Sequence, residues 1–195
     1  MKDANYNQRR QNRIKRYLRI RLGISQMIYQ PLFNILFLPI IMGTVFIWVK
    51  KDAVLCLFNV PQILFPIYKY SVLLLIILLP VIFILSMIET IGNVTARKDE
   101  ANLQNAFNEQ ELRNGFPILM NKKHIKGSNV IMREFYSNIP MRTWLERQGD
   151  IADAMNVHFV EELCYGGKSN GKRIVMYTAR GRKITQRGKL YDEEL

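Results

Sequence analysis

Cysteine and histidine are scarce in this chain, which contains two of each among its 195 residues. Cys56 lies between two apolar segments described below and Cys164 lies after both. The topology predicted from those segments places the two cysteines on opposite sides of a membrane, which excludes a disulfide between them. His124 and His158 have no second histidine or cysteine at the spacing of metal ligands. The sequence therefore predicts no disulfide framework, no metal site and no cofactor.

Catalytic patterns are also absent. Glu161 and Glu162 are adjacent, so on a strand their carboxylates point to opposite faces and cannot act as acid and base on one substrate. The segment Gly166–Arg173 begins like a phosphate-binding loop, but Arg173 stands where a serine or threonine must hold magnesium. A strand is expected to follow it, whereas a phosphate loop leads into a helix. We therefore expect a hairpin turn here, and the sequence does not predict an enzyme.

Charged residues are missing from two long apolar segments. Leu32–Val49 and Ser71–Ile88 contain no Asp, Glu, Lys, Arg or His. A helix of roughly 20 apolar residues crosses a bilayer core of about 30 Å, because it satisfies its own backbone hydrogen bonds. We expect two transmembrane helices at about 31–49 and 67–88; the alternative is a pair of core helices in a soluble protein. Without ionisable side chains in the spans, a transporter or a channel is disfavoured.

Basic residues are concentrated before the first apolar segment. Residues 1–30 hold eight Lys or Arg against one Asp, in a chain with a formal net charge of +12. The residues expected to orient the chain are Arg9, Arg10, Arg13, Lys15, Arg16, Arg19 and Arg21. Because positive flanks of membrane spans stay in the cytoplasm, both termini are predicted to be cytoplasmic and the connecting segment Lys50–Pro66 external. We expect a multi-pass protein of the bacterial plasma membrane.

Apolar residues recur within the basic segment at approximately helical spacing, at Ile14, Tyr17, Leu18, Leu22 and Ile28. One interpretation is a helix that lies on the anionic inner leaflet of the membrane. The other is a topology signal that adopts no bound shape.

The chain after the second apolar segment has the pattern of a small α+β domain. Its predicted elements are a helix at Ala96–Arg113, strands at Pro117–Met120 and Asn129–Tyr136, a helix from Pro140 to Met155, and a β-hairpin of Asn156–Tyr165 and Lys172–Ala179. The predicted organisation is thus a basic segment (1–30), a two-helix transmembrane hairpin (31–90) and a cytoplasmic α+β domain (91–195).

Five basic residues follow the predicted hairpin: Arg180, Arg182, Lys183, Arg187 and Lys189. Such a cluster can contact the phosphates of DNA or of lipid. A basic cluster without interleaved aromatic side chains is more often a solvated or lipid-facing surface, so direct nucleic-acid binding is the less favoured interpretation.

One further set of residues resembles a known family. The residues are Ile139-Pro140-Met141, Trp144, Ile151 and Met155-Asn156-Val157, followed by the hairpin and the closing Tyr191-Asp192-Glu193-Glu194-Leu195. With the two preceding spans they resemble the region before the motor in FtsK/SpoIIIE-type DNA translocases, the coupling proteins of Gram-positive conjugative elements. The resemblance implies a membrane anchor followed by a linking domain. The chain ends at Leu195, where the family's ATPase motor would begin, so ATP hydrolysis and DNA pumping are not assigned to any residue.

The sequence is compatible with three functions. The first is a non-catalytic anchor and linking module of a conjugative transfer apparatus, whose partners are an anionic inner leaflet and other proteins of the complex. The second is an unrelated two-span membrane protein with a cytosolic protein-interaction domain, and the third is a membrane-tethered DNA binder. A neighbouring reading frame that encodes a motor with a complete phosphate loop favours the first over the second. Homo-oligomerisation stays open.

Overall fold

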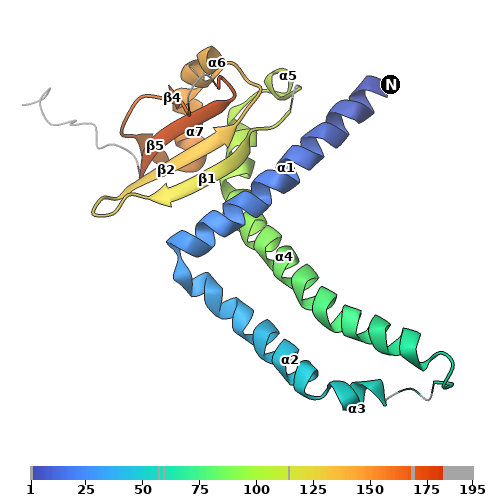
Figure 1. Ribbon diagram of the computed structural model, residues 1–195. Helices are drawn as coiled ribbons and strands as arrows, with labels where there is room; N and C mark the ends of the chain where they lie inside the picture. The colour runs from blue at the N-terminus through green and yellow to red at the C-terminus, as the bar shows by residue number, and fades with distance from the viewer. Residues whose placement is uncertain (1, 57, 59, 114, 168–169, 182–195) are drawn as a thin grey trace, which may run out of the picture. The chain divides into compact units, whose positions relative to one another are not determined.

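The computed structural model describes residues 2–56, 58, 60–113, 115–167 and 170–181, with side chains from residue 9 onward (Figure 1). The chain forms two compact units, which we call unit 1 (Met1–Thr95) and unit 2 (Ala96–Leu195). The described part of unit 1 is helical, and unit 2 combines helices with one β-sheet. One helix, α4 (Phe65–Ala106), is continuous through the boundary between the units.

Unit 1 begins with a long helix, α1 (Lys2–Tyr29). A 3₁₀ helix, η1 (Pro31–Phe37), follows it and runs directly into α2 (Leu38–Val49). At rises of about 2.0 and 1.5 Å per residue, η1 and α2 together are about 32 Å long. The tighter winding of η1 was not expected. It has a local cause, because Pro39 has no amide to donate to the Ile35 carbonyl, and the Leu38 amide donates to that carbonyl instead.

The segment between the two apolar helices folds back on their ends. It contains a short helix, α3 (Lys51–Leu55), and it meets the start of α4 through Tyr68. The Tyr68 hydroxyl donates to the Val54 carbonyl at 3.4 Å, and its ring lies edge-on to Phe58 with the centroids 6.4 Å apart. These contacts hold the apolar part of the segment against the helix ends.

The second apolar segment is part of a longer helix than the sequence predicts. The prediction separated a span at 67–88 from a helix at Ala96–Arg113, but α4 is one helix of 42 residues with Pro80 inside it. It ends at Ala106, and α5 (Glu109–Leu112) begins after Asn108. The Asn108 side chain and the Glu111 carboxylate cap α5 reciprocally, which starts a new helix where the prediction continued the old one.

Unit 2 contains a five-stranded antiparallel sheet, which confirms the α+β class (Figure 1). Its strands are β1 (Ile118–His124), β2 (Val130–Tyr136), β3 (Val157–Phe159), β4 (Cys164–Tyr165) and β5 (Arg173–Arg180). The order is β1-β2-β5-β3, and β4 pairs with β5 as well. β1 extends to His124 and has an irregularity in its pairing between Leu119 and Asn121, so the predicted strand at Pro117–Met120 was too short.

The predicted β-hairpin at the end of unit 2 is only partly correct. The first arm, predicted as Asn156–Tyr165, consists of two short strands separated by residues 160–163. β3 pairs Val157 with Arg180, and β4 pairs Cys164 with Val175, so both lie along β5. The prediction took the β-forming residues as one strand and missed the interruption.

The predicted helix from Pro140 to Met155 is two helices, α6 (Met141–Glu146) and α7 (Gln148–Met155). The break is at Arg147, with φ −91° and ψ 7°, and not at Gly149. Pro140 occupies the N-cap position, immediately before α6, and makes no side-chain capping hydrogen bond. Asn156 adopts the left-handed conformation, φ 51°, and ends α7.

The core of unit 2 lies where Trp144 of α6 packs against Phe107, the residue after α4, and against Phe135 of the sheet. Trp144 is fully buried; its ring centroid lies 5.0 Å from that of Phe107 and 5.9 Å from that of Phe135. Its indole Nε1 donates to Ser137 Oγ at 3.3 Å, which satisfies its one polar atom. Fully buried Leu103 of α4 belongs to the same unit, so this end of α4 is part of its hydrophobic core.

Candidate membrane anchor and charged surfaces

Two helical segments of the described chain are long and apolar enough to cross a membrane. They are Pro31–Val49, with a mean hydropathy of 2.3, and α4, whose most apolar part has a mean hydropathy of 3.1. Only 6% and 0% of the residues in these apolar stretches are buried, so they are not core helices within this chain. Their exposed side chains are large and apolar, as at Met42 and Leu74.

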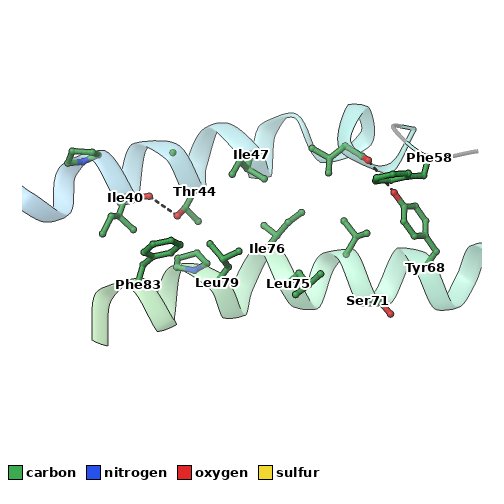
Figure 2. A pocket seen from close by; sticks show the side chains of 15 residues that line it. Ile40, Thr44, Ile47, Phe58, Tyr68, Ser71, Leu75, Ile76, Leu79 and Phe83 are labelled. Atoms are coloured by element: carbon green, nitrogen blue, oxygen red, sulfur yellow. Dashed lines mark hydrogen bonds between the residues drawn. The ribbon is translucent and has the colours of Figure 1, made fainter. Parts of the chain in front are cut away.

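An apolar groove of about 630 Å³ lies between α2 and α4 (Figure 2). Ile40 and Ile47 line it from α2, and Leu75, Leu79 and Phe83 line it from α4. Of the residues that the structure describes along this groove, none carries a charge. The Thr44 hydroxyl donates to the Ile40 carbonyl at 2.7 Å and so is satisfied within its own helix. The groove therefore presents hydrocarbon, which suits lipid chains or another apolar helix and not an ion.

The basic residues predicted to orient the chain all lie on α1. Six of them are exposed: Arg9, Arg10, Arg13, Lys15, Arg16 and Arg21. Arg19 is only 3% exposed, which the sequence did not predict. Leu18 and Leu22 are buried, whereas Tyr17 and Ile28 are exposed, so the predicted apolar set does not form one face.

α1 crosses α4 at very short range within unit 1, around Ile88 and Gly92 of α4. A Cβ added at Gly92 would overlap the carbonyl group of Arg19, and one added at Gly23 would overlap that of Ile88. Small residues permit such close backbone approach between helices. Beside the crossing, Arg16 Nε lies 3.2 Å from Glu89 Oε2. This crossing was not predicted, because its only signal in the sequence is a glycine inside each of two helical segments.

Unit 2 contains a buried cluster of charges that was not predicted from the sequence. Asp99 of α4 accepts from Lys122 Nζ at 2.8 Å and from Arg133 Nε at 3.1 Å. Arg133 Nη1 also donates to the hydroxyl of Thr178 on β5. Asp99, Arg133 and Thr178 are each no more than 5% exposed. The cluster connects α4 with β1, β2 and β5. No local sequence pattern predicts charges that pair across four elements.

The segment that begins like a phosphate-binding loop connects two strands. Gly166 ends the pairing of β4, its amide donating to the Arg173 carbonyl at 2.7 Å, and β5 starts at Arg173. Arg173 Nε donates to Glu134 Oε1 at 2.6 Å, so the guanidinium of Arg173 is engaged in an ion pair. The following element is a strand, as predicted; residues 168 and 169 lie outside the described part.

The predicted basic cluster can be placed only at its first residue. Arg180 is exposed at the end of β5. Arg182, Lys183, Arg187 and Lys189 lie outside the described residues. Within the described part, no group of three His, Cys, Asp or Glu side chains could hold a metal ion. The ring of His158 instead hydrogen-bonds through Nδ1 to the Gly181 carbonyl at 2.8 Å.

One surface arginine joins α5 and α7. Arg147 lies 3.1 Å from Asp150 and 3.2 Å from Glu111. Hydrogen bonds to these two carboxylates raise the pKa of Arg147 above its ordinary value.

Comparisons with known proteins give one match. No protein-family model matches the sequence, and no curated protein matches it. Among solved structures, the chain is similar to the pCW3 conjugation coupling protein TcpA, in its monomer form with ATPγS. The similarity has a TM-score of 0.38 and 22% sequence identity, and it covers 46% of this chain and 25% of that one.

Proposed function

We propose that this chain is a non-catalytic membrane anchor that holds unit 2 at the inner face of the bacterial plasma membrane. The observation that carries the proposal is the pair of apolar helical segments whose large side chains are exposed. Exposed apolar surface of this extent is costly in water and favourable in lipid. The length of about 32 Å for η1 and α2 fits a hydrocarbon core of about 30 Å.

The charge distribution supports the orientation of this anchor. The exposed arginines of α1 precede the first span, and Arg97 and Lys98 closely follow the second, whereas the segment between the spans carries fewer basic residues. Positive flanks are retained in the cytoplasm. In the proposed orientation, both termini and unit 2 lie inside the cell, and residues 50–66 lie outside.

A conjugative DNA-transfer apparatus is the proposed setting, and this part rests on the sequence resemblance alone. Trp144, Ile151 and Met155, which contribute to the resemblance, are buried core residues of unit 2. As core residues, they stabilise the fold of unit 2, which we propose docks on a partner. They are not proposed to form a reactive site. The proposed partners are other proteins of the transfer machinery, which the anchor keeps at the membrane.

The two native cysteines allow a direct test of the anchor and its orientation. Cys56 lies in the connecting segment and Cys164 in unit 2, and both are exposed. In intact bacteria, a membrane-impermeant maleimide should label the Cys164→Ser variant through Cys56, and should leave the Cys56→Ser variant unlabelled until the cells are lysed. The reverse pattern would invert the topology. Release of the chain from membranes by alkaline carbonate would disprove the anchor.

The conjugative setting requires a separate experiment. The chain, crosslinked in donor cells and purified in detergent, should bring down a coupling ATPase of the same element, and its deletion should lower transfer frequency. Unchanged transfer in a deletion strain that otherwise conjugates normally would contradict this part while leaving the membrane anchor intact.

A further inference from the structure

Within unit 1, α1 connects the predicted cytoplasmic ends of the two apolar segments. Its last residue, Tyr29, leads through Gln30 to Pro31, where η1 begins. Its Gly23 lies against the carbonyl group of Ile88, the last residue of the second predicted span. The stretch from Gly23 to Pro31 therefore bridges the two spans and is about 12 Å long at a helical rise. Because both spans of a membrane hairpin end at the same face, this part of α1 lies along the hydrocarbon boundary.

The rest of α1 continues along the same line. Gln30 has φ −130° and ψ 83°, which is not helical, so the chain changes direction there and α1 does not prolong the axis of the first span. Towards the N-terminus, α1 is one uninterrupted helix, and Arg10 lies about 20 Å beyond Gly23. The direction set between the two spans therefore places α1 along the inner face of the membrane.

One side of α1 carries both apolar and basic residues. Its members recur every three or four positions, and we call them the α1 stripe: Arg10, Ile14, Tyr17, Arg21, Ile24 and Ile28. Residues two before and five after Gly23 lie roughly opposite it on a helix, so the stripe faces away from α4. The side chains of Tyr17, Ile24 and Ile28 are 67%, 46% and 74% exposed, and Arg10 and Arg21 are exposed as well.

The charge of α1 indicates what covers this stripe. Residues 9–29 contain seven Lys or Arg and no Asp or Glu. Glu89 of α4 lies beside the helix, but its carboxylate pairs with Arg16 at 3.2 Å. A second copy of α1 would supply apolar contacts and no anion, whereas nucleic acid would supply anions and no hydrocarbon. The boundary between acyl chains and phosphates supplies both.

We infer that α1 is an interfacial helix whose stripe binds the anionic inner leaflet. Tyr17, Ile24 and Ile28 insert at the level where the acyl chains meet the headgroups. Arg10 and Arg21 bind the phosphates of anionic headgroups. This inference rests on the proposed membrane anchor and deepens it, because α1 then holds the inner membrane surface in addition to orienting the spans. Each Lys or Arg held at an anionic surface contributes about five-fold to binding.

The test uses the full chain in lipid nanodiscs, where both membrane faces are accessible and the orientation of the chain does not affect the result. In a Cys56→Ser and Cys164→Ser background, a fluorophore is attached at Tyr17→Cys in the stripe. The control label is at Asn12→Cys, an exposed position on the same side of α1 as Gly23. Lipids with a nitroxide headgroup quench a fluorophore that lies at the membrane surface. With phosphatidylglycerol present, the label at 17 should be quenched strongly and the label at 12 weakly.

Two double variants of equal charge show whether the stripe is responsible. Replacing Arg10 and Arg21 with Gln should lower the equilibrium constant for surface contact about 25-fold, and phosphatidylcholine discs or about 0.5 M salt should also reduce quenching at 17. Replacing Arg9 and Lys15 with Gln removes the same charge from exposed positions outside the stripe and should have a much smaller effect. Equal losses in the two variants, or quenching at 17 that is indifferent to anionic lipid, would overturn the inference.

Three further outcomes separate the alternatives. If a short bifunctional maleimide joins two chains through Tyr17→Cys while a label at 17 stays unquenched, the stripe is an interface between copies and the lipid inference is wrong. If the chain fails to incorporate into nanodiscs at all, the proposed membrane anchor has failed and the inference falls with it. Incorporation without quenching at 17 contradicts only the surface contact of α1.

Discussion

Arg133 Nε lies 3.1 Å from Asp99 Oδ2, and both residues are almost completely buried. This contact joins the last part of the longest helix of the described chain to the second strand of the sheet. Lys122 approaches the same carboxylate oxygen, so two cations share one anion. A buried ion pair of this kind contributes little net stability over an apolar core, but it is costly to break, because the remaining charge stays buried.

Removing the shared carboxylate should therefore destabilise unit 2. We expect Asp99→Ala to lower its free energy of unfolding by about 3–5 kcal/mol, because the Arg133 guanidinium would be left buried without its anion. Denaturant unfolding in detergent, followed by the fluorescence of Trp144 in a Trp48→Phe background, measures this change. Glu146→Ala removes an exposed carboxylate paired with Arg142 and should cost less than about 1 kcal/mol. Equal effects of the two variants would refute the role of the cluster.

The two tryptophans should report on different environments. Trp144 is fully buried in unit 2, whereas Trp48 is 46% exposed at the end of α2 and lies beneath Lys51 Nζ, 5.6 Å from the ring centroid. In nanodiscs, the Trp48→Phe variant should resist both aqueous quenchers and nitroxide lipids. The Trp144→Phe variant should be quenched by nitroxide lipids, because tryptophan at the end of a membrane helix lies at the interface. Quenching of Trp144 by lipid would contradict its burial within unit 2.

The periodicity of the sequence was enough to predict the α+β class and both apolar segments, since each depends on local composition. The continuity of α4 was harder to predict, because residues 89–95 are polar enough to suggest a boundary and yet contain no helix breaker apart from Gly92. The interruption of the strand at residues 160–163 and the break at Arg147 depend on how each segment packs, and helix or strand propensity does not specify them.

In the candidate site too, features set by local composition could be predicted, whereas features set by tertiary contacts could not. The exposed arginines of α1 were visible as a charge run, whereas the burial of Arg19 and the crossing at Gly92 require two distant helices to meet. Asp99, Lys122 and Arg133 are separated by up to 34 positions. Nothing in their local sequence distinguishes these charges from solvated ones, so only the fold identifies the cluster.

The helix crossing in unit 1 should be sensitive to a single methyl group. We expect Gly92→Ala to separate α1 from α4, because the new Cβ would overlap the Arg19 carbonyl group, at a cost of about 1–3 kcal/mol. Gly43→Ala is the matched control, since a Cβ added there meets nothing within 4 Å. With cysteines introduced by Arg16→Cys and Glu89→Cys, in a background without the native cysteines, a short bifunctional maleimide should crosslink the helices. Gly92→Ala should reduce this yield, and Gly43→Ala should not.

The arginines of α1 should set the orientation of the chain. Arg9, Arg10 and Arg13 are exposed, and positive charge before the first span is what retains this end in the cytoplasm. Replacing all three with Gln should give a mixed population, in which the labelling of Cys56 by impermeant maleimide in intact cells falls and that of Cys164 rises. Replacing Arg113, Arg142 and Lys172 with Gln removes the same charge from unit 2 and should leave labelling uniform, because these residues lie far in sequence from both spans. A mixed population in that control, or uniform labelling in the α1 variant, would show that residues other than these three arginines determine the topology.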